Sequence, residues 1–323
     1  MKKIRAGVVG VGHLGRFHAE KYAALDGVDL VGVVDVMGER AQEVASRVGA
    51  RAYGDYAALF GLVDAVSIAT PTESHLKVGL EFLEKGIDVL IEKPLAMNSF
   101  EAERLVREAD RRGAVLQVGH LERFNPAVTA LEGHVSDPMF IEAYRLAPFP
   151  GRSIDIDVIL DLMIHDIDII MNLVQADVVD VKATGIPVIT DTVDMANARL
   201  RFANGCVANV TASRVSDEMV RKTRLFQHDS YITIDYAHQR IVITKAVHGS
   251  AGGVKKMLSE DLDIAKGDSL LEEIRSFVEC SASGRAPLVT GVAGKRAIEV
   301  AERIQGSVEA SMVRFKKGLH SGV

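Results

Sequence analysis

The first part of the chain alternates short apolar runs with longer stretches in which charged residues recur every three or four positions. Apolar runs of this length are typical of buried parallel strands, and the charged stretches are typical of amphipathic helices. Asn98, with Glu101 three residues later, predicts the start of one of these helices. Strands are expected at 4–9, 30–34, 65–69, 89–91 and 115–118, with helices such as 13–24 and 99–112. This alternation predicts a parallel sheet with helices on both faces.

The pattern changes after Gly119. Asn204-Gly205 lies between two expected strands and predicts a tight hairpin turn, so the second sheet should be mainly antiparallel. The segment 247–257 is rich in Gly, Ser and Lys and is expected to be a loop. Helices are expected at 123–132, 156–174, 269–283 and 291–312, and strands at 139–146, 178–189, 193–202, 206–214, 222–234 and 240–245. The fold class is therefore α/β, with a doubly wound parallel sheet in residues 1–120 and a second α/β domain with a large, mainly antiparallel sheet in residues 121–323.

Composition removes several classes of function. A chain of 323 residues with a formal net charge of −6 has no basic stripe for nucleic acid. It contains no apolar run of about 18 residues, so we expect no membrane span, and the apolar start is interpreted as a strand rather than a signal peptide. Cys206 and Cys280 lie far apart, which indicates no metal site and favours a reduced, cytoplasmic location.

A glycine-rich turn, Gly10-Val11-Gly12-His13-Leu14-Gly15, follows the first expected strand and precedes a helix. Glycines there permit a tight turn and the close approach of a pyrophosphate to a helix N-terminus. Asp35 ends the second strand, where a carboxylate accepts hydrogen bonds from ribose hydroxyls and repels a 2′-phosphate, so NAD is favoured over NADP. The alternative is a glycine turn that binds nothing. The residues expected to bind NAD here are Gly10, Gly12, His13, Leu14 and Asp35.

Ala69-Thr70-Pro71-Thr72 ends another expected strand, and His75 opens the next helix. Ligands of doubly wound sheets lie at such strand ends, so Thr70, Pro71 and His75 are expected to contact the cofactor. A Thr-Pro pair is also a common way to begin a helix, which is the alternative interpretation.

Val89-Leu90-Ile91-Glu92-Lys93-Pro94 places a Glu-Lys pair at a strand end, where Glu92 and Lys93 are expected beside a bound nicotinamide. Together with the glycine turn, Asp35 and the ATPTESH and ERFNP stretches, this segment resembles the Gfo/Idh/MocA family of sugar and inositol dehydrogenases. The resemblance spans nearly the whole chain and implies a Rossmann domain followed by a substrate-binding and oligomerisation domain. Family members commonly associate through the second sheet, which implies a homodimer or homotetramer. An apolar face expected on the strands at 193–214 also favours an even number of subunits.

The helix expected at 156–174 carries its polar side chains on one narrow stripe, and almost all its other residues are Ile, Leu, Met or Val, with Asp166 the main exception. Such a stripe indicates the polar wall of a cavity, and a solvent-facing stripe is the alternative. The stripe consists of Asp157, Asp161, His165, Asp168 and Asn172.

Within this stripe, Asp161-x-x-x-His165 resembles the family's second motif. The resemblance implies that His165 is the general base, that Lys93 polarises the reacting oxygen and that Asp161 orients the site, although Lys93 and His165 could exchange roles. Many family members carry glycines before and inside this motif. Here Met163 occupies the internal position and no glycine occurs from 154 to 160, so local packing and substrate clearance are expected to differ.

The strings GHLERFNPAV, YRLAPFPGRSIDIDV and DLMIHDIDII resemble a subgroup that includes UDP-N-acetylglucosamine 3-dehydrogenases. A nucleotide diphosphate requires cationic clamps, which Arg145, Arg152, Arg221 and Arg224 could supply, although each alone is more often a surface or ion-pair residue. The residues expected to contact the sugar or nucleotide-sugar substrate are Lys93, Arg123, Asn125, Arg152, Asp161 and His165.

Three other functions stay open at this point. The chain could oxidise inositol or a free sugar, or it could be a non-catalytic NAD-dependent sensor of the same fold. An imine or biliverdin reductase is a further possibility, for which the Asp-x-x-x-His pair is not required. The joint presence of Lys93, Asp161 and His165 counts against a sensor, which requires none of them. The hydroxyl that reacts and the physiological direction are not specified by these patterns.

Overall fold

The computed structural model describes residues 3–149, 156–247 and 256–320, with residues 314–320 described by their backbone alone. The chain divides into two compact units, each built from two segments. One comprises Met1–Phe124 and Asp268–Ile298, and the other comprises Asn125–Gly267 and Glu299–Val323.

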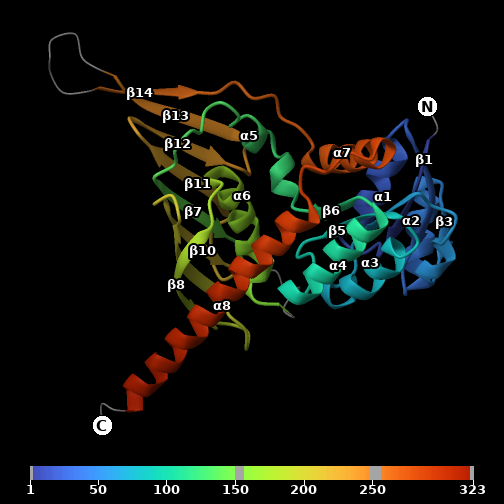
Figure 1. The fold of residues 1–323 in the computed structure, drawn as a ribbon, viewed down its shortest axis with the longest axis horizontal. Coiled ribbons are helices and arrows are strands. Elements are labelled where there is room, and N and C mark those ends of the chain that lie inside the picture. The colour runs from blue at the N-terminus through green and yellow to red at the C-terminus, as the bar shows by residue number, and fades with distance from the viewer. Residues whose placement is uncertain (1–2, 150–155, 248–255, 321–323) are drawn as a thin grey trace. The chain divides into compact units, whose positions relative to one another are not determined.

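The first unit contains a six-stranded parallel sheet in the order β3-β2-β1-β4-β5-β6 (Figure 1). This order reverses between β1 and β4, which is the switch point of a doubly wound sheet, where ligands bind at the carboxyl ends of the strands. The inner strands are almost wholly buried, because helices cover both faces. The strands are β1 (Ile4–Val9), β2 (Val28–Val34), β3 (Arg51–Tyr53), β4 (Ala65–Ile68), β5 (Asp88–Glu92) and β6 (Leu116–Gly119).

The helices of this unit fall into two groups by their contacts. α1 (Gly15–Ala24) contacts α2 (Gly38–Val48), whereas α3 (His75–Leu83) contacts α4 (Ser99–Arg112). The predicted start of α4 is confirmed, because the Asn98 side chain accepts a hydrogen bond from the amide of Glu101 at 2.9 Å. Short 3-10 turns occur at η1 (Tyr56–Leu59), η2 (Thr72–Ser74) and η3 (Leu121–Phe124).

α7 (Ser269–Ser283) belongs to the first unit, although the sequence pattern assigned it to a second domain. It packs on α1, and its buried Ile274, Phe277 and Cys280 join the core that lines β1. The helix therefore returns from the later part of the chain to complete the first hydrophobic core. The first turns of α8 (Gly291–His320) belong to this unit as well.

The second unit contains an eight-stranded sheet in the order β14-β13-β12-β11-β7-β10-β9-β8. All neighbouring strands are antiparallel except β7 and β10, so the predicted mainly antiparallel sheet is confirmed. The strands are β7 (Phe140–Leu146), β8 (Val178–Ile186), β9 (Met195–Phe202), β10 (Val207–Ser213), β11 (Val220–Gln227), β12 (Ser230–Asp235), β13 (Arg240–Val247) and β14 (Lys256–Asp261).

Three details of this sheet differ from the sequence pattern. The single strand predicted at 222–234 is two strands, β11 and β12, joined by a turn in which Asp229 has a positive φ of 59°. β14 occupies part of the segment predicted as a loop, and residues 248–255 lie outside the described part of the chain. In the hairpin between β9 and β10, only Gly205 of the Asn-Gly pair has a positive φ, which fits a three-residue loop rather than a two-residue turn.

The apolar face of β9 and β10 is buried within its own unit, where α6 (Ile164–Val174) contacts β7 and β10. The opposite face is polar, with Asn197 bonded to Thr211 and Arg199 bonded to Asn209. The apolar face of these strands is therefore already covered without a second subunit. The prediction of an even number of subunits from an uncovered apolar face is wrong in that respect.

The helix predicted at 156–174 divides into two parts. Residues Ile159–Met163 form a π-helical segment that leads into α6, and a short helix, α5 (Pro126–Thr129), lies earlier in the unit. A π-helical turn contains one more residue than the pattern assumed, so the polar positions are rotated relative to a regular α-helix. Such segments occur frequently at functional sites.

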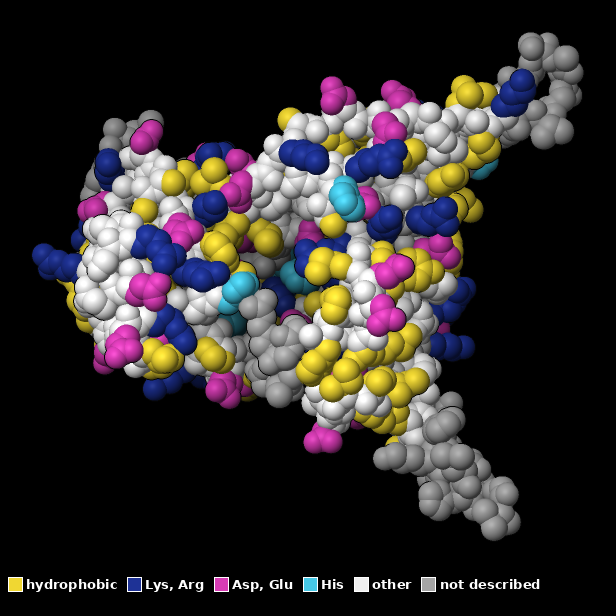
Figure 2. Space-filling model, turned by 180° about the vertical axis from the view of Figure 1, so that it is seen from behind, with side chains coloured by type: hydrophobic (Ala, Val, Ile, Leu, Met, Phe, Trp, Pro, Cys, Tyr) yellow, Lys and Arg dark blue, Asp and Glu magenta, His cyan; other side chains and the backbone are white. Residues whose placement is uncertain are grey.

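Within the described residues, no helix is both long and apolar enough to cross a membrane. On the face drawn in Figure 2, Lys and Arg side chains alternate with Asp and Glu side chains, which agrees with the net charge of −6 and shows no broad basic area on that face.

Candidate active site

The glycine turn connects β1 to α1, and each of its three glycines lies in different surroundings. Gly10 has a φ of +82°, and a Cβ there would lie 2.8 Å from the Ala69 carbonyl oxygen. A Cβ at Gly15 would lie 1.7 Å from the carbonyl oxygen of Gly10, so this position sets the close packing of helix on strand. A Cβ at Gly12 would meet only Arg40, 3.8 Å away. The backbone at Gly12 is thus the part of the turn that a bound group can approach.

Asp35 follows β2 and is buried, with its carboxylate turned toward the glycine turn. It accepts hydrogen bonds from the amides of Val11 at 3.1 Å and Met37 at 2.9 Å. Nη1 of Arg40 lies 3.4 Å from the same carboxylate. No arginine follows Asp35 directly in the sequence, but the first turn of α2 supplies one that pairs with it.

The loop after β4 lies against the glycine turn, as expected for a switch point. The side chain of Thr70 would be 2.9 Å from a Cβ at Gly10, and its hydroxyl accepts a hydrogen bond from Ser74. Nδ1 and Nε2 of His75 each lie 2.9 Å from a backbone carbonyl, of Pro94 and of Thr70 respectively. Burial lowers the pKa of His75, and these carbonyl contacts only partly offset that effect. His75 therefore ties the ends of β4 and β5 together, and its ring nitrogens face the backbone rather than a ligand.

β5 ends at Glu92, and the half-buried Lys93 follows at the carboxyl edge of the sheet. The Lys93–Pro94 peptide bond is cis. Oε1 of Glu92 lies 2.9 Å from Nε2 of His18 on α1, and Oε2 accepts the Lys93 amide at 3.3 Å. Burial alone would raise the pKa of Glu92, but the hydrogen bond and charge of His18, together with Lys93, leave that pKa below its ordinary value. Glu92 thus supports the backbone at Lys93, and the sequence patterns did not point to its partner His18.

The residues of the polar stripe in the second unit differ in their surroundings. Asp157, Asp161, His165 and Asn172 are half-buried, whereas Asp168 is buried. Asp157 caps the π-helical segment through the amides of Ile159 and Leu160, both at 3.0 Å, and accepts a hydrogen bond from Gln305 of α8 at 2.7 Å. The structure therefore assigns Asp157 to helix capping. Asp161 lies within the π-helical segment, and His165 lies in the first turn of α6, which follows it.

Arg145 is not available as a phosphate clamp. Its side chain is buried and donates two hydrogen bonds to Asp166, at 2.8 and 3.0 Å. Asp166, the one charged residue off the predicted stripe, is therefore a structural partner that neutralises the charge of this interior guanidinium group. Arg221 and Arg224 are exposed on β11, and Arg152 lies outside the described residues.

Arg123 and Asn125 follow β6 and are both buried. Oδ1 of Asn125 caps α5 through the Ala127 amide at 3.0 Å, and its Nδ2 donates to the carbonyl of Tyr236 at 3.1 Å. Both ends of the Asn125 side chain are thus engaged within the second unit, which is a structural role. A substrate contact by Arg123 or Asn125 stays a prediction, as do those of Lys93, Asp161 and His165.

The first unit fits a dinucleotide. Gly12 leaves room for a pyrophosphate where a Cβ would otherwise intrude, and Asp35 offers carboxylate oxygens at the end of β2. His13 and Leu14 are exposed at the start of α1. Thr70 and Pro71 lie at the neighbouring strand end. The residues expected at this edge therefore lie there, with the His75 ring held by backbone carbonyls, and their contacts with NAD stay a prediction.

Two family models match the chain. Residues 4–120 match a model described as an oxidoreductase family with an NAD-binding Rossmann fold, and residues 131–230 match a Gfo/Idh/MocA C-terminal domain. Among curated proteins, a UDP-N-acetylglucosamine 3-dehydrogenase of Acidithiobacillus ferrooxidans is 44% identical over 97% of this chain and 100% of its own length. A scyllo-inositol 2-dehydrogenase (NAD(+)) of Bacillus subtilis is 28% identical over 92% of each chain.

Solved structures give a similar result. The UDP-N-acetylglucosamine 3-dehydrogenase structure from Acidithiobacillus ferrooxidans has a TM-score of 0.91 and 44% identity, covering 96% of this chain and 99% of that one. A levoglucosan dehydrogenase in complex with NADH and levoglucosan has a TM-score of 0.86 at 19% identity, covering 96% and 98% of the two chains. At that identity the second likeness shows the fold alone.

Proposed function

Because this chain belongs to the Gfo/Idh/MocA family of NAD-binding oxidoreductases, we propose that it oxidises the 3-hydroxyl of UDP-N-acetylglucosamine and transfers the hydride to NAD. The observation that carries the proposal is the likeness, over nearly the full length of both chains, to the UDP-N-acetylglucosamine 3-dehydrogenase of Acidithiobacillus ferrooxidans. The inositol dehydrogenases are more distant relatives, so an inositol or free-sugar substrate is the second candidate.

The proposed reaction removes a hydride from the carbon that bears the hydroxyl and a proton from its oxygen. When bound, NAD accepts the hydride. His165 acts as the general base for the hydroxyl proton, since an imidazole titrates near neutral pH by nature. Lys93 donates a hydrogen bond to the reacting oxygen and stabilises the negative charge that develops there. Asp161 orients the groups around it, and the exchange of roles between Lys93 and His165 is the alternative assignment.

The diphosphate of the substrate needs cationic partners. With Arg145 committed to Asp166, the arginines left for this role are Arg221 and Arg224 on β11, together with Arg152. The proposal also includes a homodimer or homotetramer and a cytoplasmic location. Cys206 and Cys280 are free and buried, which is compatible with a reducing compartment.

A substrate panel tests this proposal. The purified protein is incubated with NAD and a series of UDP-sugars, free sugars and inositols, and the formation of NADH is followed. UDP-N-acetylglucosamine should give the highest kcat/KM, and free N-acetylglucosamine should be much poorer because it lacks the diphosphate. A higher kcat/KM for an inositol would replace the proposed substrate. NAD binding without turnover on any polyol would indicate a sensor, and NADH oxidation by an imine or a tetrapyrrole would indicate a reductase.

A further inference from the structure

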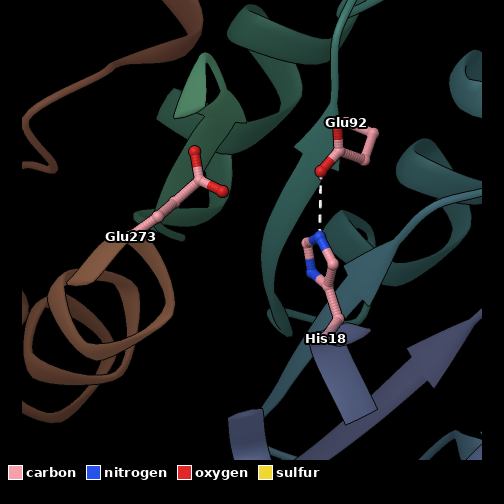
Figure 3. A group of neighbouring side chains, drawn as sticks. All are labelled: His18, Glu92 and Glu273. Carbon is pink, nitrogen blue, oxygen red and sulfur yellow. Dashed lines mark hydrogen bonds and ion pairs between the residues drawn. The ribbon is translucent and has the colours of Figure 1, made fainter. Parts of the chain in front are cut away.

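Three ionisable side chains meet in the interior of the first unit, below the strand end that carries Lys93. They are His18 of α1, Glu92 of β5 and Glu273 of α7, and all three are buried. One ligand-type atom from each lies within 4.8 Å of those of the other two. Figure 3 shows the Glu273 carboxyl directed toward the hydrogen-bonded pair of His18 and Glu92.

The charge of Glu92 is supported. Its two oxygens are bonded to Nε2 of His18 and to the amide of Lys93. Hydrogen bonds to a carboxylate favour its charged form, so Glu92 can stay ionised in this interior position.

Glu273 has the opposite surroundings. Its side chain is 0% exposed, and neither carboxyl oxygen has a hydrogen-bond partner among the described residues. The Gln117 side chain donates to the backbone carbonyl of Glu273 at 3.1 Å, not to its carboxyl group. Burial raises the pKa of Glu273 well above its ordinary value, and the charge of Glu92 raises it further. A second carboxylate here would lack hydrogen-bond donors among the described residues and would lie beside the charge of Glu92.

The same three residues could in principle bind a cation. Ligand atoms around a tetrahedral zinc ion with bonds near 2.1 Å lie about 3.4 Å apart. Here Nε2 of His18 and Oε1 of Glu92 are directly hydrogen-bonded at 2.9 Å, which is closer than two ligand atoms of one zinc ion would lie. The geometry matches a hydrogen-bonded pair with a separate carboxyl group beside it better than it matches a metal centre.

We propose that Glu273 is a positioning residue that keeps its proton and packs as a neutral acid against the His18–Glu92 pair. Glu92 then carries the only negative charge of the cluster, and that charge stays directed at His18 and at the amide of Lys93. Glu273 acts on Lys93 only through Glu92. The effect on turnover rests on the proposed function, whereas the protonation of Glu273 does not.

A single-atom change tests the protonation. Glu273→Gln replaces the acid by a neutral group of nearly the same shape, and Glu272→Gln makes the same change one residue earlier, at an exposed side chain that pairs with Arg275. In the unfolded chain Glu273 has its ordinary pKa of 4.5, so above that pH the folded state binds one proton more than the unfolded state. Wild-type stability should therefore fall relative to Glu273→Gln as the pH rises from about 4.5 toward the raised pKa.

Other titratable groups lie around Glu273. His18 and Tyr22 face it from α1, and Glu92 faces it from β5. Burial raises the pKa of Tyr22 well above its ordinary value. These groups are present in wild type and in both variants. The difference between the two glutamine variants therefore isolates Glu273.

The result expected is that Glu273→Gln is at least as stable as wild type at pH 8 and that its advantage disappears near pH 4.5, while Glu272→Gln shows no such trend. An infrared band of a protonated carboxylic acid should be present at pH 8 in wild type and absent from Glu273→Gln alone. A loss of stability in Glu273→Gln that grows with pH would overturn the proposal, because it would show that the carboxylate form is the native one. Stoichiometric metal in the purified wild type that is lost from Glu273→Gln would overturn it in favour of a cation site.

Turnover tests the positioning role. Glu273→Ala leaves a gap behind Glu92 and should lower kcat by about tenfold or more with a smaller change in KM for NAD, because small displacements of a reacting group are costly. Glu273→Gln should restore kcat to near the wild-type value. Equal kcat in wild type and Glu273→Ala would remove the positioning role. The stability and infrared measurements need no substrate, so they still decide the protonation of Glu273 if the proposed substrate is wrong.

Discussion

Asp194 and Glu273 are both wholly buried carboxyl groups, one in each unit, and their surroundings are opposite. Asp194 accepts hydrogen bonds from the amides of Val188, Ile189 and Thr190 at 2.7–2.8 Å and pairs with Arg214 at 2.8 Å. Burial alone would raise the pKa of Asp194, but these hydrogen bonds leave it far below its ordinary range. Glu273 receives no donor from the described residues, and its pKa is raised.

The comparison shows that burial alone does not decide whether a carboxyl group is charged. The hydrogen-bond donors directed at the group also decide it. Where every polar atom is satisfied, as around Asp194 and Arg214, the cluster holds a loop against its sheet. Where one acid is left without donors, as at Glu273, the cluster lies directly behind a residue of the proposed reaction. Buried polar groups without partners are the ones for which a function should be sought first.

The largest effect on stability should come from breaking the buried ion pair between Asp194 and Arg214. The Arg214 side chain is buried and also donates to the carbonyl of Ile156 and to the hydroxyl groups of Thr190 and Thr192. Arg214→Met should lower the free energy of unfolding by about 3–5 kcal/mol, because it leaves Asp194 charged and without its counter-ion. Denaturant unfolding measures this, with the exposed Arg199→Met as the matched control. A loss no larger than that of Arg199→Met would show that the pair contributes little.

Next in size is the effect of Lys93 on turnover. Lys93→Met should reduce kcat by about a hundredfold or more, while NAD binding and the free energy of unfolding stay close to wild type. His165→Ala should act in the same direction. Steady-state kinetics, NAD titration and denaturant unfolding together separate the two kinds of effect. Unchanged turnover in either variant would remove that residue from the mechanism.

The pH dependence of stability should have opposite signs in the two clusters. Asp194 has a lowered pKa, so its contribution is present above its ordinary value of 3.8 and is lost as the pH falls below it. Asp194→Asn should therefore be less stable than wild type at pH 7, by roughly 3 kcal/mol, and this deficit should shrink at pH 3. Unfolding curves at the two pH values measure it. A deficit that is independent of pH would mean that the charge of Asp194 does not matter.

The smallest effect concerns the choice of cofactor at Asp35. Asp35→Ser should weaken NAD binding by about tenfold, because a charged acceptor for the ribose hydroxyls is lost. It should also strengthen NADP binding, since Arg40 is released beside the position of a 2′-phosphate. Fluorescence titration with both cofactors measures the change. If Asp35→Ser combined with Arg40→Met binds NADP as well as Asp35→Ser alone, Arg40 has no part in it.

Local pattern was sufficient to predict the strands of the first unit except β3, together with the glycine turn, Asp35 and the Glu92-Lys93 strand end. Each of these depends on residues that are close together in the sequence. The membership of α7 in the first unit was not predictable in this way, because its Phe277 and Cys280 meet partners more than 200 residues earlier in the chain. Composition alone cannot show which core a helix completes.

The charged residues of the interior were the least predictable. Arg145 is the type of residue expected in a phosphate clamp, but its guanidinium group is paired with the carboxylate of Asp166 on α6. Glu273 and its neighbour Glu272 lie in the same amphipathic helix, but Glu273 is buried and Glu272 is exposed. The two differ only in the face of the helix on which they lie. A weak signal was present, since Glu273 lies on the same face as Ile274 and Phe277. The π-helical segment has no local signature, so the pattern predicted one regular helix through these residues.

The most direct test of the proposed activity uses UDP-N-acetylglucosamine that carries deuterium on C3 of the sugar. The protein is incubated with this substrate and NAD, and the reduced cofactor is analysed by mass spectrometry. The proposed reaction predicts NADH that carries the deuterium, because the hydride comes from the carbon that bears the reacting hydroxyl. NADH without deuterium would place the oxidation at another carbon, and no NADH at all would contradict the proposed function.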